Sequence, residues 1–154
     1  MMDRVNRRIS ILYRYGQRFL TARLKPLGLE VGLLPSFLQV CRFPGITQEE
    51  ISAHTGMDKG TTARSVKKLE EQGYVFRTGD PADRRVNHIQ PTSQARALEP
   101  LVEEVVEELH RHLYRGFSPQ EICLTLEILS RMQKNLEEAL SQPHSPRKAE
   151  GLEK

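Results

Sequence analysis

Apolar residues recur at helical intervals in long stretches near both ends of the chain. The first stretch predicts a helix from Asp3 to Lys25, which stops there because Pro26 disfavours helical backbone in the residue before it. Its apolar face consists of Val5, Ile9, Leu12, Gly16, Phe19 and Leu24. The helix is therefore amphipathic and should pack along one side.

Two more long helices are predicted after residue 92. One runs from about Thr92 to Tyr114, with its apolar face at Leu98, Leu101, Val102, Val105, Leu109 and Leu113. The other begins at Ser118-Pro119-Gln120-Glu121, a capping box with proline at the first helical position, and runs to about Leu140. From Gln142 onward, proline and charged residues predict a flexible tail.

The middle of the chain predicts three shorter helices. Leu33 to Arg42 forms a buried helix that ends at Phe43-Pro44-Gly45. Thr47-Gln48-Glu49-Glu50 is a capping box that starts a helix of about two turns, which ends at Thr55-Gly56. Asp58 can cap the next helix, which runs from Lys59 to Gln72. Two short helices joined by a glycine turn are typical of a helix-turn-helix.

The second helix of this pair has two distinct faces. One side groups Thr62, Val66 and Leu69, and the other groups Thr61, Arg64, Lys67 and Lys68. Arg64 can donate two hydrogen bonds to guanine in a DNA major groove, and Thr61 or Ser65 can reach base edges or phosphates. On charge alone a solvated helix face is the better explanation, but the sequence context reverses that preference in favour of DNA.

That context is a charged β-hairpin directly after Gly73. Strands are predicted from Tyr74 to Thr78 and from Val86 to Gln90, and the loop 79–85 between them holds Arg84 and Arg85 away from any apolar anchor. Such a loop suits a phosphate or a minor groove, whose narrow walls concentrate negative potential. Asp83 should pair with Arg85 or a neighbouring arginine and fix its direction. Because Pro91 lacks an N–H donor, the second strand should end early or lie on an edge.

The predicted fold class is mainly α with a small β-hairpin wing: a winged helix-turn-helix flanked by N-terminal and C-terminal dimerisation helices. Its DNA-binding residues are predicted to be Thr47, Lys59, Thr61, Thr62, Arg64, Ser65, Lys68, Arg77, Asp83, Arg84 and Arg85. The expected partner is double-stranded DNA.

At these positions the sequence resembles the MarR family of bacterial and archaeal transcriptional regulators. The matching residues are Asp58-Lys59, Leu69-Glu70 and Gly73 in the second helix, Asp80-Pro81-Ala82-Asp83-Arg84-Arg85 in the wing, and Thr92 before the next helix. The most specific piece is the Asp-x-Arg of the wing, Asp83 and Arg85. The resemblance implies a minor-groove contact by Arg85 that Asp83 supports, a major-groove contact by the second helix, and a homodimer.

The chain is expected to divide into four segments. These are a dimerisation helix at 1–30, the winged helix-turn-helix at 31–92, dimerisation helices at 93–141 and a flexible tail at 142–154. The terminal helices have more apolar length than a small winged helix needs, and a second copy would bury the surplus in a two-fold dimer. The second helices of two copies, about 34 Å apart, would match successive major grooves of a pseudo-palindromic operator. The expected function is a sequence-specific regulator, most simply a repressor.

Charge and cysteine usage fit this expectation. The formal net charge is only +3, but residues 1–25 contain seven Lys and Arg against one Asp, whereas residues 99–108 contain five Glu and no Lys or Arg. Such segregation lets one region approach phosphate while another stays away from it, although both segments could also be solvated helix faces, the favoured interpretation of the Glu run. Two isolated cysteines, with no signal peptide and no apolar run of membrane-spanning length, predict a cytoplasmic protein without a membrane partner.

Catalysis, a metal ion and a cofactor are not expected. The five histidines lack a nucleophile at suitable spacing, there is no glycine-rich phosphate loop, and His110 and His112 diverge because they are two residues apart on a helix. The alternative that the sequence leaves open is a winged helix that coats DNA without sequence preference or binds protein.

The resemblance also implies release of DNA by a phenolic or other lipophilic effector, or by oxidation of a cysteine. An effector crevice would lie near Tyr13, Phe37 and Met57, but side chains of these types at these spacings more often belong to a plain core. Cys41 lies in an apolar helix and is expected to be packing. Oxidation sensing at Cys123, near a helix start, is a hypothesis.

Overall fold

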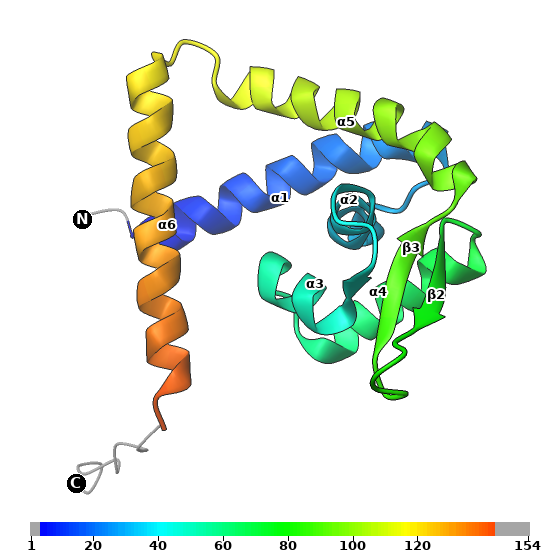
Figure 1. The fold of residues 1–154 in the computed structure, drawn as a ribbon. Coiled ribbons are helices and arrows are strands. Elements are labelled where there is room, and N and C mark those ends of the chain that lie inside the picture. The colour runs from blue at the N-terminus through cyan, green and yellow to red at the C-terminus, as the bar shows by residue number, and fades with distance from the viewer. Residues whose placement is uncertain (1–3, 144–154) are drawn as a thin grey trace, which may run out of the picture. The chain divides into compact units, whose positions relative to one another are not determined.

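The computed structural model describes residues 4–143, which form two units, one ending at Leu113 and the other beginning at Tyr114. The first unit contains α1 (Val5–Leu24), the 3₁₀ helices η1 (Lys25–Leu27) and η2 (Val31–Leu33), α2 (Leu34–Arg42), β1 (Ile46–Thr47), α3 (Gln48–Thr55), α4 (Lys59–Glu71), β2 (Val75–Gly79), β3 (Asn87–Pro91) and α5 (Ser93–Leu113). The second contains α6 (Pro119–Ser141). Figure 1 shows the elements in order. Most of the predicted flexible tail lies outside the described residues.

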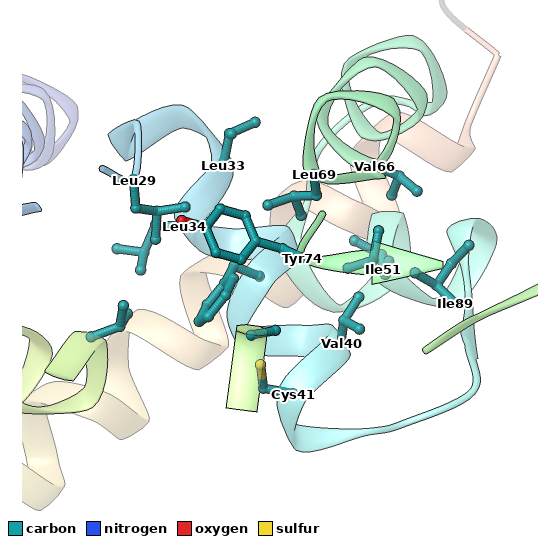
Figure 2. Close-up of a cluster of buried hydrophobic side chains, with 14 of the residues drawn as sticks. Leu29, Leu33, Leu34, Val40, Cys41, Ile51, Val66, Leu69, Tyr74 and Ile89 are labelled. Carbon is teal, nitrogen blue, oxygen red and sulfur yellow. The ribbon is translucent and has the colours of Figure 1, made fainter. Parts of the chain in front are cut away.

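The core of the first unit is one buried cluster to which α1, α2, α3, α4, α5 and the sheet all contribute. Phe37 and Val40 of α2 are fully buried there, and Phe37 packs edge-on against Tyr74 with ring centroids 5.8 Å apart. Figure 2 shows this apolar cluster, to which α3 contributes Ile51 and α4 contributes Leu69. Pro35 is tolerated in α2 because the first helical turn needs no backbone donor.

Glycine turns set the lengths of α3 and α4. Gly56 has φ 72° and ends α3, and its amide donates to Ser52 O. Gly73 has φ 80° and ends α4, with its amide donating to Glu70 O at 3.0 Å and the Tyr74 amide donating to Leu69 O at 2.9 Å. This pair of bonds is a Schellman motif, and its left-handed residue favours glycine.

The sheet has three antiparallel strands in the order β1-β3-β2, so the wing hairpin is joined by a strand that the sequence did not predict. β1 is only two residues long and pairs Ile46 with Ile89 and Thr47 with His88. Both predicted wing strands exist, but each begins one residue later than expected. The second does not end early: β3 includes Pro91, which pairs with Val75 of β2 beyond the end of β1 and therefore needs no donor on that side.

α1 and α5 pack side by side in the first unit (Figure 1). Leu20 and Leu24 of α1 and Val102 of α5 are buried, and Arg23 Nε donates to Glu108 Oε1 at 2.9 Å. The N-terminal half of α1 is different, because its apolar stripe is exposed, with Leu12 at 55%.

The second unit consists mainly of α6. Its start confirms the predicted capping box, since the Ser118 hydroxyl accepts the Glu121 amide N–H while the Glu121 carboxylate accepts the Ser118 amide N–H. None of the residues of α6 is buried. Among the described residues, no helix is long and apolar enough to cross a membrane. Together the two units confirm the predicted fold class of a mainly helical chain with a small sheet.

Replacing Leu69 by alanine should destabilise the fold by about 2–5 kcal/mol, because it leaves a cavity beneath α4 in a fully buried cluster. Urea unfolding followed by circular dichroism at fixed protein concentration measures this loss. The matched control is Lys67→Ala, an exposed position two residues earlier on the same helix, which should change the free energy of unfolding by less than about 0.5 kcal/mol. Equal losses in both variants would contradict the described packing of α4.

Candidate nucleic-acid interface

Side-chain caps fix the starts of both α3 and α4, as the sequence predicts. Thr47 Oγ1 accepts the Glu50 amide N–H at 3.2 Å, and Glu50 Oε2 accepts the Thr47 amide N–H at 2.8 Å. At α4, Asp58 accepts the Thr61 amide N–H at 2.7 Å and the Thr61 hydroxyl at 2.8 Å. These bonds lower the pKa of the Glu50 and Asp58 carboxyls, since each stabilises the charged form.

The inner face of α4 is partly polar. The Thr62 hydroxyl donates to Asp58 O at 3.0 Å, so Ser52, whose hydroxyl lies 2.8 Å away, is the donor to Thr62. Ser65 donates to Ser36 on α2 at 2.8 Å, and both serines are buried. The prediction that Thr62 and Ser65 contact DNA is therefore wrong, because both hydroxyls face the core and are already bonded.

The outer face of α4 is cationic. Arg64 and Lys67 are exposed, and Arg64 Nη2 donates to Thr61 Oγ1 at 3.2 Å. Gly60 leaves room for this arrangement, because a Cβ there would lie 3.2 Å from Arg64 Nη1 and 3.3 Å from Asp58 Oδ1. The guanidinium therefore lies over the first turn of the helix.

The two predicted lysines of α4 differ in their surroundings. Lys59 is exposed and lines a shallow pocket of about 150 Å³ together with Gln48, Glu49 and Ser52 of α3. Lys68 is also exposed, but its Nζ lies 3.1 Å from Glu30 Oε2. A phosphate near Lys68 would compete with this surface ion pair, which is weak in water.

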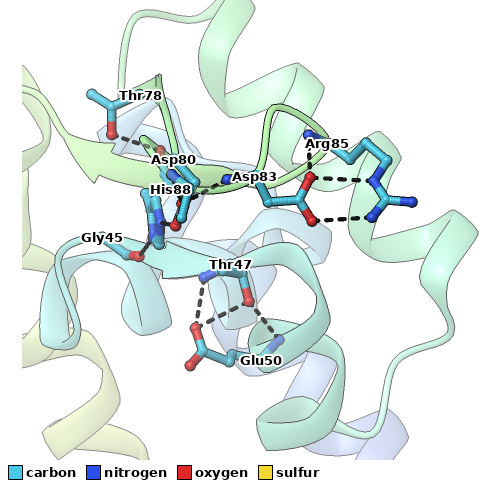
Figure 3. Close-up of polar contacts among 9 residues, drawn as sticks. Gly45, Thr47, Glu50, Thr78, Asp80, Asp83, Arg85 and His88 are labelled. Atoms are coloured by element: carbon cyan, nitrogen blue, oxygen red, sulfur yellow. Dashed lines mark hydrogen bonds and ion pairs between the residues drawn. The ribbon is translucent and has the colours of Figure 1, made fainter.

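The wing presents an arginine that its own loop orients. Arg85 donates to Asp83 Oδ1 through its amide at 3.0 Å and through Nε at 3.2 Å, and its side chain is 90% exposed (Figure 3). The Arg85 amide and then its side chain lower the pKa of Asp83. The predicted pairing of Asp83 with Arg85 is confirmed. Arg84 beside them is exposed as well.

Arg77 has a different position from the other predicted arginines. Its Nε donates to Glu70 Oε2 and its Nη1 to Gln48 Oε1, both at 2.9 Å, so it ties β2 to α4 and α3. A pocket of about 220 Å³ nevertheless brings it together with two other predicted residues, Thr47 and Arg85. The other residues that line this pocket are Gln48, Glu49, Val86 and Asn87. The start of α3 and the base of the wing thus form one surface.

The predicted effector residues differ in their exposure to solvent. Phe37 is fully buried in the core, whereas Tyr13 on α1 is 65% exposed and Met57 is half-buried. Phe37 is therefore part of the core, the interpretation that the sequence favoured over a ligand crevice. A pocket of about 490 Å³ exists elsewhere, lined by Thr21, Lys25, Gly28, Leu29, Glu30, Val31 and Gly32.

The two cysteines have contrasting environments. Burial raises the pKa of the Cys41 thiol to about 11, which keeps it protonated and unreactive, as expected for packing. Cys123 is exposed. Within residues 4–143, no group of three or more metal-binding side chains comes together.

Sequence reasoning missed a histidine-aspartate contact at the base of the wing. His88 of β3 lies 2.8 Å from Asp80 in the loop after β2. The two residues are eight positions apart, and this spacing becomes informative only when the register of the hairpin and the length of its loop are known.

Known proteins match both the sequence and the fold. The model of the MarR family matches residues 37–86, from α2 into the wing loop. The HTH-type transcriptional regulator YybA of Bacillus subtilis is 27% identical over 136 residues, which are 88% of this chain and 91% of the relative.

Solved structures of MarR family regulators have the same fold as this chain. The crystal structure of a MarR transcriptional regulator from Methanosarcina mazei Go1 is 34% identical, with a TM-score of 0.77 over 86% of this chain and 96% of that one. A MarR family regulator from Listeria monocytogenes, crystallised with a 26mer DNA, has a TM-score of 0.85 over 94% of this chain and 99% of that one. At 23% identity this second likeness shows the shared fold. All these relatives are transcriptional regulators, not enzymes, and the chain belongs to the MarR family of transcriptional regulators.

Proposed function

We propose that two copies of this chain bind one double-stranded DNA site, with α4 in the major groove and the wing in the adjacent minor groove. The supporting observation is that two cationic elements face solvent by different means. Arg64 and Lys67 project because the opposite face of α4 is buried, and Arg85 projects because Asp83 orients it. A helix suits the wide groove and a single arginine suits the narrow one.

Residues between these elements support one continuous interface. Gln48 and Glu49 line both the pocket that contains Arg85 and the pocket that contains Lys59. The start of α3 therefore connects the wing to the start of α4. We keep three further residues as proposed contacts with phosphate: Thr47, Arg77 and Lys68. Phosphate contacts position a protein on DNA without reading its sequence.

Unpartnered apolar faces support a homodimer. Ile9 and Leu12 on α1 are exposed, and Leu136 and Leu140 on α6 are 66% and 85% exposed. A second copy that covered these helices would remove apolar surface from water. We accordingly assign residues 1–30 and 93–141 to dimerisation and 31–92 to DNA binding.

The regulatory part of the proposal comes from the family resemblance. We propose a repressor role, with release of DNA by a lipophilic ligand, because the family resemblance implies both. A protein that binds chromosomal DNA of a bacterium or archaeon works in the cytoplasm, which we propose as its location.

Selection of binding sites from a random DNA pool tests the proposal. We expect a consensus with two-fold symmetry, half-sites about 10 base pairs apart, two chains per duplex, and at least about 1,000-fold preference over random DNA at physiological salt. If no sequence were enriched, or if one chain bound each duplex, the result would instead favour a winged helix that coats DNA or binds protein.

Arg85→Ala should weaken binding to the selected duplex about 10-fold to 100-fold, because it removes a groove contact made only with DNA. Fluorescence anisotropy measures the affinity, and sedimentation measures the dimer, which should be unchanged. Arg111→Ala, an exposed arginine on α5, is the matched control and should bind as the parent does. Parental affinity in Arg85→Ala would exclude the proposed role of the wing.

Arg64→Ala should relax the base preference at one position in each half-site, because we propose that Arg64 bonds guanine from the exposed face of α4. A repeated pool selection with the variant measures this change. Lys67→Ala provides the comparison, since a lysine that contacts phosphate should weaken binding about equally for all sequences and reduce its salt dependence. An unchanged consensus with Arg64→Ala would mean that Arg64 does not contact bases.

A further inference from the structure

His88 connects the wing loop to the body of the DNA-binding unit. It lies on the central strand β3, opposite Thr47 of β1 and Thr78 of β2. Its Nδ1 is 2.7 Å from Gly45 O, just before β1, and its Nε2 is 2.8 Å from Asp80 Oδ2, just after β2 (Figure 3). The side chains of His88 and Asp80 are only partly exposed.

The chemistry of these two contacts requires a charged imidazole. A backbone carbonyl oxygen and an ionised carboxylate can only accept hydrogen bonds, so both ring nitrogens of His88 must donate. Neutral histidine has one N–H and would turn a lone pair toward either Gly45 O or Asp80 Oδ2. Both bonds therefore exist together only in the imidazolium form.

The surrounding charges favour this form. The hydrogen bond to Asp80 and then the bond to Gly45 O raise the pKa of His88, and Glu50 on α3 is a second carboxylate that acts in the same direction. The hydrogen bond from His88 and then those from the Ala82 and Asp83 amides lower the pKa of Asp80. Near pH 6 the pair is thus an ion pair.

From Asp80 the hydrogen bonds continue to the tip of the wing. Asp80 Oδ1 accepts the Ala82 amide at 2.7 Å and the Asp83 amide at 3.1 Å. Asp83 in turn accepts from Arg85. A continuous chain of contacts therefore runs from Gly45 in the body, through His88 and Asp80, to the guanidinium proposed for the minor groove.

We propose that His88 and Asp80 are positioning residues that hold the wing loop and thereby Arg85 in place for DNA, and that loss of the His88 proton weakens DNA binding. This inference rests on the proposed function. It adds a histidine that does not touch DNA but sets the affinity through the loop it holds.

The direction of the pH effect follows from the two shifts. A raised histidine pKa means that its stabilising contribution is complete below the unfolded value, about 6.5, and is lost as the pH rises through the folded value. A lowered aspartate pKa means that its contribution is present above about 3.9 and is lost as the pH falls through the folded value. The contact between His88 and Asp80 is complete between these limits. DNA affinity should therefore fall as the pH rises through the folded pKa of His88.

Two variants separate positioning from a general effect of charge. The Gln side chain in His88→Gln cannot replace the two N–H donors on opposite sides of the imidazolium ring. The DNA affinity of this variant should therefore be low, and it should not show the fall with rising pH that deprotonation of His88 causes. In Asp80→Asn, the side-chain amide N–H can donate to unprotonated Nε2 while its oxygen still accepts the Ala82 and Asp83 amides. Neutral His88 then keeps both bonds, and tight binding should persist at high pH.

The experiment measures affinity for the selected duplex by fluorescence anisotropy from pH 6 to pH 8.5 at constant salt. Affinity of the parent should fall about threefold to tenfold more than that of His88→Gln, the range expected for one lost hydrogen bond. Affinity of Asp80→Asn at pH 8.5 should stay within about twofold of its value at pH 6. His54→Gln, which removes another exposed histidine of the same unit, should follow the parent.

An NMR titration of the His88 ring without DNA provides an independent readout. Its pKa should be lower in Asp80→Asn than in the parent, and thermal melting should show that both proteins are folded. If the parent binds the duplex and His88→Gln shows the same pH profile, positioning by His88 is excluded while DNA binding stands. If the parent binds no duplex at any pH, the proposed function fails and the inference fails with it.

Discussion

Burial of one face of α4 is the constraint on which the candidate interface depends. Val66 and Leu69 pack into the cluster formed around Phe37 of α2, and their spacing fixes the rotation of the helix about its axis. Once these positions face inward, Arg64 and Lys67 must face solvent. The orientation of the cationic surface is therefore a consequence of core packing and not of attraction to a ligand.

Polar groups inside that interface make the rotation more specific. Apolar contacts tolerate small rotations, but the Ser65 hydroxyl is satisfied by Ser36 and the Thr62 hydroxyl by Ser52 and Asp58 O. Turning α4 would leave these buried hydroxyls without partners, which is costly in a low-dielectric interior. Among the described residues, no buried side-chain polar atom lacks a partner.

The wing depends on a different kind of interaction. Its loop packs few apolar side chains, and polar contacts from His88 through Asp80 and Asp83 determine where Arg85 lies. Such contacts are partly exposed and respond to protonation and salt more than a buried cluster does. The same unit thus combines a helix that the core holds rigidly with a loop that solution conditions can adjust.

The helices, both caps of the helix-turn-helix, the wing hairpin and the pairing of Asp83 with Arg85 were predictable from sequence, because these features depend on residues close together in the chain. The sequence-based assignment of Thr62 and Ser65 to the DNA contact was wrong, and β1 and the His88–Asp80 contact were not foreseen. These features emerged only from the folded chain, because burial and strand register depend on which distant segments meet. Helical periodicity separates two faces of α4, but the partners Ser36 and Ser52 decide how far the buried face extends around it.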